Sequence, residues 1–129
     1  MIGGYLKNEV MKYSTDGTLI KRLADLPANR FNHACTHFNS EIWVAGGSTY
    51  GIDSVLNSVL VLDLVTNTWK EIESLQKPRY VHTMHVLGMP TVFGGSGAPR
   101  TAEVYNGSGW DIISLPHGHS RHASVVVYC

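Results

Sequence analysis

The stretch Ile42-Trp43-Val44-Ala45-Gly46-Gly47 decides the fold, because an apolar run that ends in a glycine doublet recurs along the chain. Further doublets stand at Gly3-Gly4 and Gly94-Gly95, so successive doublets are 43 and 48 residues apart. Self-similarity at a period of this size indicates a repeat architecture, in which each unit buries its apolar faces against its neighbours. The doublets therefore divide the chain into units of similar length.

Other landmarks follow each doublet in a constant order. A short apolar segment comes first, then a turn, and then one bulky apolar residue at Ile20, Trp69 or Trp110. An arginine follows ten or eleven residues later, at Arg30, Arg79 and Arg121. Because chance does not hold such spacings to within one residue, we interpret the chain as a tandem repeat.

Each unit is predicted to form four short strands. The first is rich in β-branched residues and apolar on both faces, at residues 34–38, 81–86 and 123–128. A turn at Asn39-Ser40 or Gly88-Met89-Pro90 leads into the second strand, which ends at the doublet. The third covers 9–13, 59–63 and 103–105, and the fourth begins at the bulky landmark. No segment shows sustained helical periodicity with caps, so the predicted class is all-β.

Four antiparallel strands per unit, at a period of 41 to 49 residues, predict β-propeller blades. The glycine doublet, a tyrosine such as Tyr105 in the third strand and a tryptophan opening the fourth resemble the kelch repeat over essentially the whole chain. The resemblance implies a partial blade at 1–29, complete blades at 30–78 and 79–120, and the first strand of the next or closing blade at 121–129. About three blades are thus expected, as part of a six-bladed propeller.

The overall composition excludes several classes of protein. The 10 Lys+Arg balance the 10 Asp+Glu and the sequence pI is near 7.1, so no basic patch is available for nucleic acid or a membrane surface. No apolar run approaches the roughly 18–20 residues of a membrane span. The two cysteines, Cys35 and Cys129, are too few for a disulfide framework, so we expect a reducing, cytoplasmic setting.

Candidate binding residues lie in the two sets of connections that differ most between units. One set follows the second strand and carries Tyr50 and Arg100; the other precedes the first strand and carries Arg30-Phe31, Arg79-Tyr80 and Arg121-His122. The kelch resemblance implies that both sets emerge at one end of the propeller. Arginine beside an aromatic residue is typical of interface hot spots, and arginine pairs with acidic groups in a bidentate manner. The alternative is that the repeated arginines form scaffold hydrogen bonds and that the aromatic residues only cover the blade edge.

A metal or catalytic centre is not expected. His117, His119 and His122 cluster within six residues, but the cluster lies in a glycine-containing loop without paired cysteines. His33 and His37 would share one strand face, which makes two ligands rather than three or four. No phosphate-binding glycine loop, nucleophile elbow or pair of carboxylates stands out. We therefore predict no cofactor and no enzyme activity.

Two functional classes follow from the resemblance. The first is a protein–protein interaction module, since many kelch domains recruit substrates for cullin-type ubiquitin ligases and others bind actin. The second is an enzyme, since kelch-like propellers also include a copper radical oxidase and a sugar mutarotase. The oxidase needs a Tyr–Cys pair with further ligands, which these residues do not assemble. We favour the interaction module with a protein or peptide partner, in a fragment of a longer chain or a homodimer closing a six-bladed ring.

Overall fold

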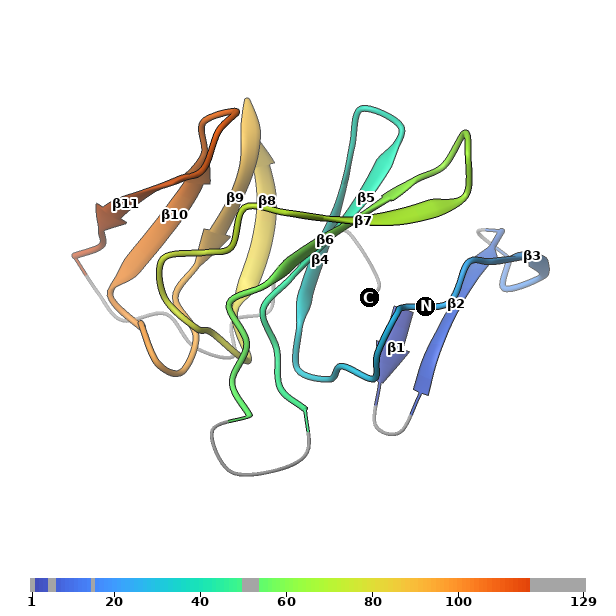
Figure 1. The fold of residues 1–129 in the computed structure, drawn as a ribbon, viewed down its shortest axis with the longest axis horizontal. Helices are drawn as coiled ribbons and strands as arrows, with labels where there is room; N and C mark the ends of the chain where they lie inside the picture. The colour runs from blue at the N-terminus through green and yellow to red at the C-terminus, as the bar shows by residue number, and fades with distance from the viewer. Residues whose placement is uncertain (1, 5–6, 15, 50–53, 117–129) are drawn as a thin grey trace.

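The computed structural model describes residues 2–4, 7–14, 16–49 and 54–116. Within these ranges there are eleven strands and no helix, in agreement with the predicted all-β class. The strands form three antiparallel sheets that stand side by side in chain order, with the first (blue) at the right and the third (orange) at the left of Figure 1. We call them the first, second and third blades. The strand expected at 123–128 lies outside the described residues.

The first blade has three strands, in the order β1-β2-β3. They are β1 (Ile2–Gly4), β2 (Lys7–Tyr13) and β3 (Leu19–Leu23). Its outer pair is aligned by Val10 opposite Leu23 and Lys12 opposite Lys21, with a register shift beside Tyr13. Val10 and Leu23 are buried in the cluster shared with the second blade, whereas Leu19 and Ile20 of β3 are exposed.

The second and third blades each have four strands in a meander. The second consists of β4 (Ala34–Phe38), β5 (Glu41–Ala45), β6 (Val59–Asp63) and β7 (Thr68–Ile72). The third consists of β8 (Thr83–Leu87), β9 (Met89–Phe93), β10 (Thr101–Tyr105) and β11 (Trp110–Ser114). The first strands of the two blades, β4 and β8, lie against each other, and the later strands fan outward from them (Figure 1).

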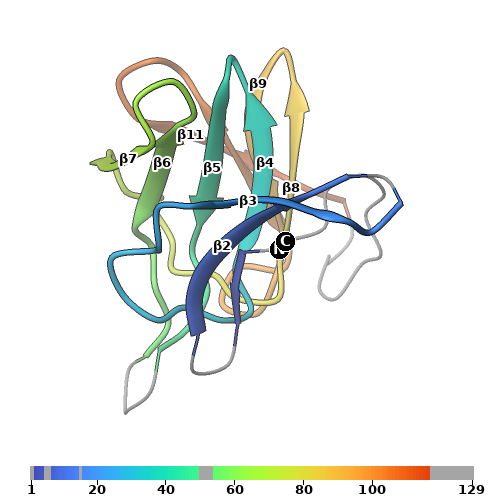
Figure 2. The same ribbon diagram turned by 90° about the vertical axis from the view of Figure 1, so that its right-hand side faces the viewer.

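The turn predicted at Asn39-Ser40 is present, whereas the turn predicted at Gly88-Met89-Pro90 differs from the expectation. Asn39 and Ser40 have φ values of 48° and 58°, so the tight turn from β4 to β5 uses the left-handed region that asparagine tolerates. The turn expected at Gly88-Met89-Pro90 is shorter than predicted, because β9 already begins at Met89. Pro90 is buried in that strand opposite Val86. These hairpin tips lie at the upper edge of Figure 2.

Two apolar clusters hold the blades together. Between the second and third blades, Trp43 lies edge-on to Tyr105 and Trp110, with ring centroids 5.0 and 6.3 Å apart. This geometry adds to the stabilisation from buried area. The other buried members of this cluster are Ala34, Ala45, Val59, Val61, Leu75, Met84 and Val92. The cluster between the first and second blades consists of Val10, Leu23, Leu26, Cys35, Val44, Leu60 and Leu62.

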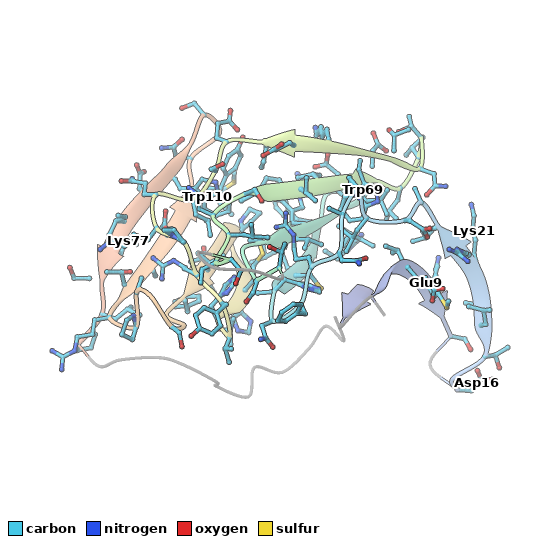
Figure 3. All side chains as sticks on the ribbon, turned by 60° about the horizontal axis from the view of Figure 1, so that its bottom comes forward. Glu9, Asp16, Lys21, Trp69, Lys77 and Trp110 are labelled. Carbon is cyan, nitrogen blue, oxygen red and sulfur yellow. The ribbon has the colours of Figure 1, made fainter. Side chains whose placement is uncertain are left out.

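Each of the two repeat tryptophans hydrogen-bonds across a blade boundary. The indole Nε1 of Trp69 donates to the carbonyl of Ala24 at 2.8 Å, and that of Trp110 donates to the carbonyl of Glu73 at 2.8 Å. Figure 3 shows the two side chains at the two blade junctions. Each of these hydrogen bonds ties a tryptophan ring to the backbone of the preceding blade and so helps to fix the spacing between neighbouring blades.

Candidate functional site

The two sets of variable connections meet at one end of the molecule. Phe31 and Ser48 exchange backbone hydrogen bonds of 3.1 and 2.8 Å, and Tyr80 and Ser96 exchange bonds of 3.4 and 2.9 Å. The segment before a first strand is thus paired with the segment after a glycine doublet in both complete blades. We define the loop face as residues 27–33, 46–49, 54–58, 76–82 and 94–100, which lie along the lower edge of Figure 1.

Arg30 lies in the interior beneath the loop face. Its Nη1 donates to the carbonyls of Gly46 and Ser58 at 3.0 Å each, and its Nη2 donates to Ser58 Oγ at 2.7 Å. Among the described residues it forms no ion pair. Burial lowers the pKa of the guanidinium from its ordinary value, opposed in part by Glu71.

Arg79 occupies the same position in the third blade, with more partners. Its Nη1 donates to the carbonyls of Gly94, Ala98 and Thr101 at 2.9, 3.1 and 2.9 Å, and its Nη2 donates to Thr101 Oγ1 at 2.7 Å. The side chains of Arg79 and Glu103 have no exposed surface and form an ion pair of 3.0 Å. Desolvation lowers the pKa of Arg79, while the hydrogen bond that Arg79 donates to Glu103 opposes that shift.

These contacts correct the expectation that Arg30 and Arg79 face a partner. Both guanidinium groups are turned inward and donate to backbone carbonyls at the base of the loops. A buried arginine whose donors are used in this way stabilises the scaffold, which is the alternative that the repeated spacing left open. Arg30 and Arg79 therefore hold the loop face in place without contributing their charged groups to its surface.

Glu103 was missed by the sequence reasoning and organises the loop beside it. Its carboxylate accepts the backbone N–H of Gln76 and, at 3.3 Å, that of Lys77, in addition to Arg79 Nε at 3.0 Å. The signal was present in the sequence, because Glu103 stands between the apolar residues Ala102 and Val104 on its strand. The same position of the second blade is Leu60, as the pairings of the two third strands show.

The glycine doublets allow the loops to approach closely. The N–H of Gly47 donates to the carbonyl of Arg79 at 2.7 Å, which joins the second blade to the loop of the third. Gly46 has a φ of 61°, and a Cβ there would lie 2.5 Å from the same carbonyl oxygen. No other residue type fits this combination of backbone angle and space. The doublet is therefore a structural requirement of the loop face.

His82 is buried beside the doublets. Its ring lies against Gly46, and its Cβ lies against Gly95. Desolvation lowers the pKa of His82 from 6.5 to about 3, and the nearby charge of Arg79 acts in the same direction. The imidazole is therefore neutral at pH 7 and acts as a packed ring between two blades.

The remaining predicted binding residues are nearer the surface. Phe31 and Tyr80 are half-buried and occupy matching positions in the two loop pairs, and Arg100 is exposed. Lys77, which sequence reasoning did not single out, is also exposed and projects beside the third blade (Figure 3). Tyr50, Arg121 and His122 lie outside the described residues. The structure thus places Phe31, Tyr80 and Arg100 on the loop face.

The described residues were also searched for a metal-binding cluster and for a membrane-spanning helix. Within the described ranges, no three His, Cys, Asp or Glu side chains are grouped so that they could hold a metal ion. The histidines at 117, 119 and 122 lie outside those ranges, as does Cys129. The described part of the chain also contains no helix with the length and apolar character needed to cross a membrane.

Comparisons with known proteins agree with this geometry. The model of the kelch motif matches residues 29–76. An F-box/kelch-repeat protein of Arabidopsis thaliana is 41% identical over 115 residues, which are 82% of this chain and 30% of that protein. The solved structure of YjhT has the same fold, with a TM-score of 0.70 at 14% identity, over 83% of this chain and 45% of YjhT. The chain thus spans less than half the length of both relatives. With its glycine doublets, four-stranded sheets and inter-blade tryptophans, it is a kelch-repeat protein.

Proposed function

We propose that the loop face binds another protein, and that the chain acts as an interaction module rather than as an enzyme. The observation that carries this proposal is the pairing of Phe31 with Ser48 and of Tyr80 with Ser96. This pairing holds two half-buried aromatic side chains at equivalent places on a rigid base. Loops on a rigid scaffold are the usual location of binding residues, and aromatic anchors carry much of the energy of protein interfaces.

The charges of the loop face favour an acidic partner. Lys77 and Arg100 are exposed on neighbouring loops, since Gly97 of one loop lies against Pro78 of the other. Arg30 lies beneath this surface without an ion-pair partner among the described residues, whereas the charge of Arg79 is balanced by Glu103. The described loop face therefore has an excess of positive charge. Aspartate or glutamate side chains of a peptide would be attracted to it.

The cellular role that we propose is recruitment of a substrate protein to a ubiquitin ligase of the cullin type. Support comes from the relative whose name combines an F-box with kelch repeats. Because the chain covers only 30% of that relative, this role belongs to a larger protein of which such repeats are one part. A cytoplasmic location goes with this role. Actin binding is the other protein-binding role that kelch repeats suggest.

The proposal is tested by capture of partners with the intact chain and with a variant. Arg100→Glu reverses an exposed charge on the loop face, so we expect it to lose acidic partners that the unmodified chain retains at low salt. Val65→Glu places the same carboxylate at a position that is 84% exposed in the turn between β6 and β7, and serves as the matched control. Equal capture by the Arg100 variant and the control would contradict the proposal.

A further inference from the structure

The turn between β10 and β11 contains Asn106 followed by Gly107, and no other asparagine of the chain precedes a glycine. Both residues are exposed, and Gly107 has a φ of 96°. A Cβ at Gly107 would meet none of the described residues within 4 Å, so this part of the turn is open. Asparagine is among the chemically labile residues, because the main-chain nitrogen of the next residue can attack its side-chain amide.

Two features of this turn favour such an attack. The N–H of Gly107 donates no hydrogen bond to any of the described residues, and glycine has no side chain to hinder the approach of its nitrogen. The Oδ1 of Asn106 accepts the N–H of Ser108 at 2.9 Å and the hydroxyl of Ser108 at 3.2 Å. These donors point at the oxygen on which negative charge develops when Cγ is attacked, and donors so placed stabilise that charge.

Asn67 provides a contrast, since it lies in the corresponding turn of the second blade. Its Oδ1 accepts the N–H of Ala24 at 2.9 Å across the blade boundary, so its side chain is anchored to the neighbouring blade. Asn67 is half-buried, and it is followed by Thr68, whose branched side chain crowds the main-chain nitrogen. The two turns therefore differ in the exposure of the amide and in access to it.

From this geometry we propose that Asn106 is a site of spontaneous deamidation. The nitrogen of Gly107 gives up its proton to water and forms a bond with Cγ of Asn106. The bond from Cγ to Nδ2 breaks, and the amide nitrogen takes up a proton and leaves as ammonia. Water then opens the resulting cyclic imide at either of its carbonyls, which gives aspartate or isoaspartate. Water is the co-reactant throughout, and no atom is oxidised or reduced.

The first blade indicates that the aspartate product fits this turn. Its own turn between β2 and β3 carries Asp16-Gly17, and Gly17 has a φ of 86°. The carboxylate of Asp16 accepts the N–H of Thr18, two residues further on, at 2.9 Å, and the amide of Asn106 makes the same contact in its own turn. Aspartate at position 106 therefore keeps the turn. It adds a negative charge beside Asp111, whose carboxylate accepts an N–H of the Asn106 amide at 3.0 Å in the unmodified chain.

The isoaspartate product does not fit in the same way, because it lengthens the main chain by a methylene group. The turn is closed by a bond of 2.9 Å from the N–H of Asn106 to the carbonyl of Gly109. The hydroxyl of Tyr105 also donates to the carbonyl of Gly107 at 3.2 Å. Tyr105 packs edge-on against Trp43 of the second blade, with ring centroids 5.0 Å apart. Isoaspartate at position 106 therefore weakens the boundary between the second and third blades.

The test follows the intact 129-residue chain during incubation in mildly alkaline buffer, where the N–H proton is lost more readily. Samples are digested, and the amide and acid forms of each asparagine are measured by mass spectrometry, with a sample from the start of the incubation as the blank. We expect progressive loss of the amide form at Asn106, matched by the appearance of aspartate and isoaspartate there. The amide of Asn67 should persist over the same period, and equal loss at Asn67 and Asn106 would overturn the proposal.

The chain unfolded in guanidinium chloride is the control for the reactivity that the sequence alone sets. Asn106 is expected to lose its amide in both the folded and the unfolded chain. A folded chain that keeps this amide while the unfolded chain loses it would overturn the proposal, because the turn would then protect the group.

The two products are compared by thermal unfolding. Freshly purified Asn106→Asp supplies the aspartate form directly and should melt at the temperature of the unmodified chain. The isoaspartate form, separated by chromatography from the incubated sample, should melt at a lower temperature. Equal melting temperatures for the two forms would overturn the effect that we assign to the blade boundary.

Discussion

Glu103 and Arg79 form an ion pair of 3.0 Å in which neither side chain has any exposed surface. The same carboxylate accepts backbone N–H groups of Gln76 and Lys77, so one buried acid fixes both the arginine and the start of the loop. The half-buried aromatic residue of that loop, Tyr80, directly follows the arginine. The loop that carries Tyr80 is therefore held in place by a buried polar network beneath the loop face.

The first prediction concerns this pair. Glu103→Leu leaves Arg79 buried without its counter-charge, so we expect a loss of about 3–5 kcal/mol in the free energy of unfolding, measured by urea titration. Charge reversal of Arg79 is expected to cost at least as much, because two carboxylates would then face each other in the interior.

A matched control for this pair lies on the surface. Arg22 and Asp25 also form an ion pair of 2.9 Å, but their side chains are 55% and 37% exposed. Asp25→Asn should cost no more than about 1 kcal/mol. Similar losses for Glu103→Leu and Asp25→Asn would contradict the assignment of a structural role to the buried pair.

The second prediction concerns backbone strain at the loop face. Asn32 and Val81 occupy matching positions after Arg30 and Arg79, and both have a φ of 54°. A β-branched residue in this region is unfavourable by roughly 1–2 kcal/mol, whereas asparagine tolerates it. We therefore expect Val81→Asn to stabilise the chain by about 1 kcal/mol, measured by thermal unfolding. The reciprocal change, Asn32→Val, should destabilise it by a similar amount, and a lower melting temperature for Val81→Asn would count against the observed backbone geometry.

The third prediction concerns the pH dependence of the free energy of unfolding. The pKa of His82 is lowered from 6.5 to about 3 in the folded chain, chiefly by desolvation and further by Arg79 and His33. Between these values the unfolded chain binds one more proton at this group than the folded chain. Stability from His82 is therefore complete above pH 6.5 and falls toward pH 3, by about 1.4 kcal/mol per pH unit.

The measurement is the free energy of unfolding between pH 7 and pH 4, in the unmodified chain and in His82→Gln. Glutamine has no proton to gain in this range, so the variant should lack that part of the slope, whatever its stability at pH 7. His85 of β8 is less buried than His82, so His85→Gln is the matched control and should keep the slope that His82 produces. Identical slopes for the unmodified chain and His82→Gln would contradict a buried neutral imidazole.

The strands were predictable from the sequence because the repeat supplies landmarks at fixed positions. The segments 34–38 and 59–63 agree with β4 and β6 to the residue, and β11 begins at Trp110 as expected. Alternating and β-branched residues between glycines leave few other arrangements for such short segments. Pro90 was placed in a turn because proline usually interrupts a strand, whereas β9 accommodates it opposite Val86.

The candidate site was predictable in location and only in part in composition. The variable loops do meet at one end, and Phe31, Tyr80 and Arg100 lie there. The orientation of the Arg30 and Arg79 side chains was not predictable. An arginine beside an aromatic residue gives the same sequence pattern whether its guanidinium faces solvent or backbone carbonyls. Only the three-dimensional structure shows that the carbonyls of Gly46 and Gly94 face the interior, where they accept hydrogen bonds from the buried guanidinium groups.

The most direct test of the central claim compares binding with folding in Tyr80→Ala. The backbone of Tyr80 pairs with Ser96 through main-chain atoms, so the substitution retains those bonds and removes only the ring. We expect the affinity for a captured partner to fall by about 2 kcal/mol, roughly 30-fold, while the free energy of unfolding changes by less than about 1 kcal/mol. Unchanged affinity in a folded Tyr80→Ala chain would contradict the claim that the loop face is the binding surface.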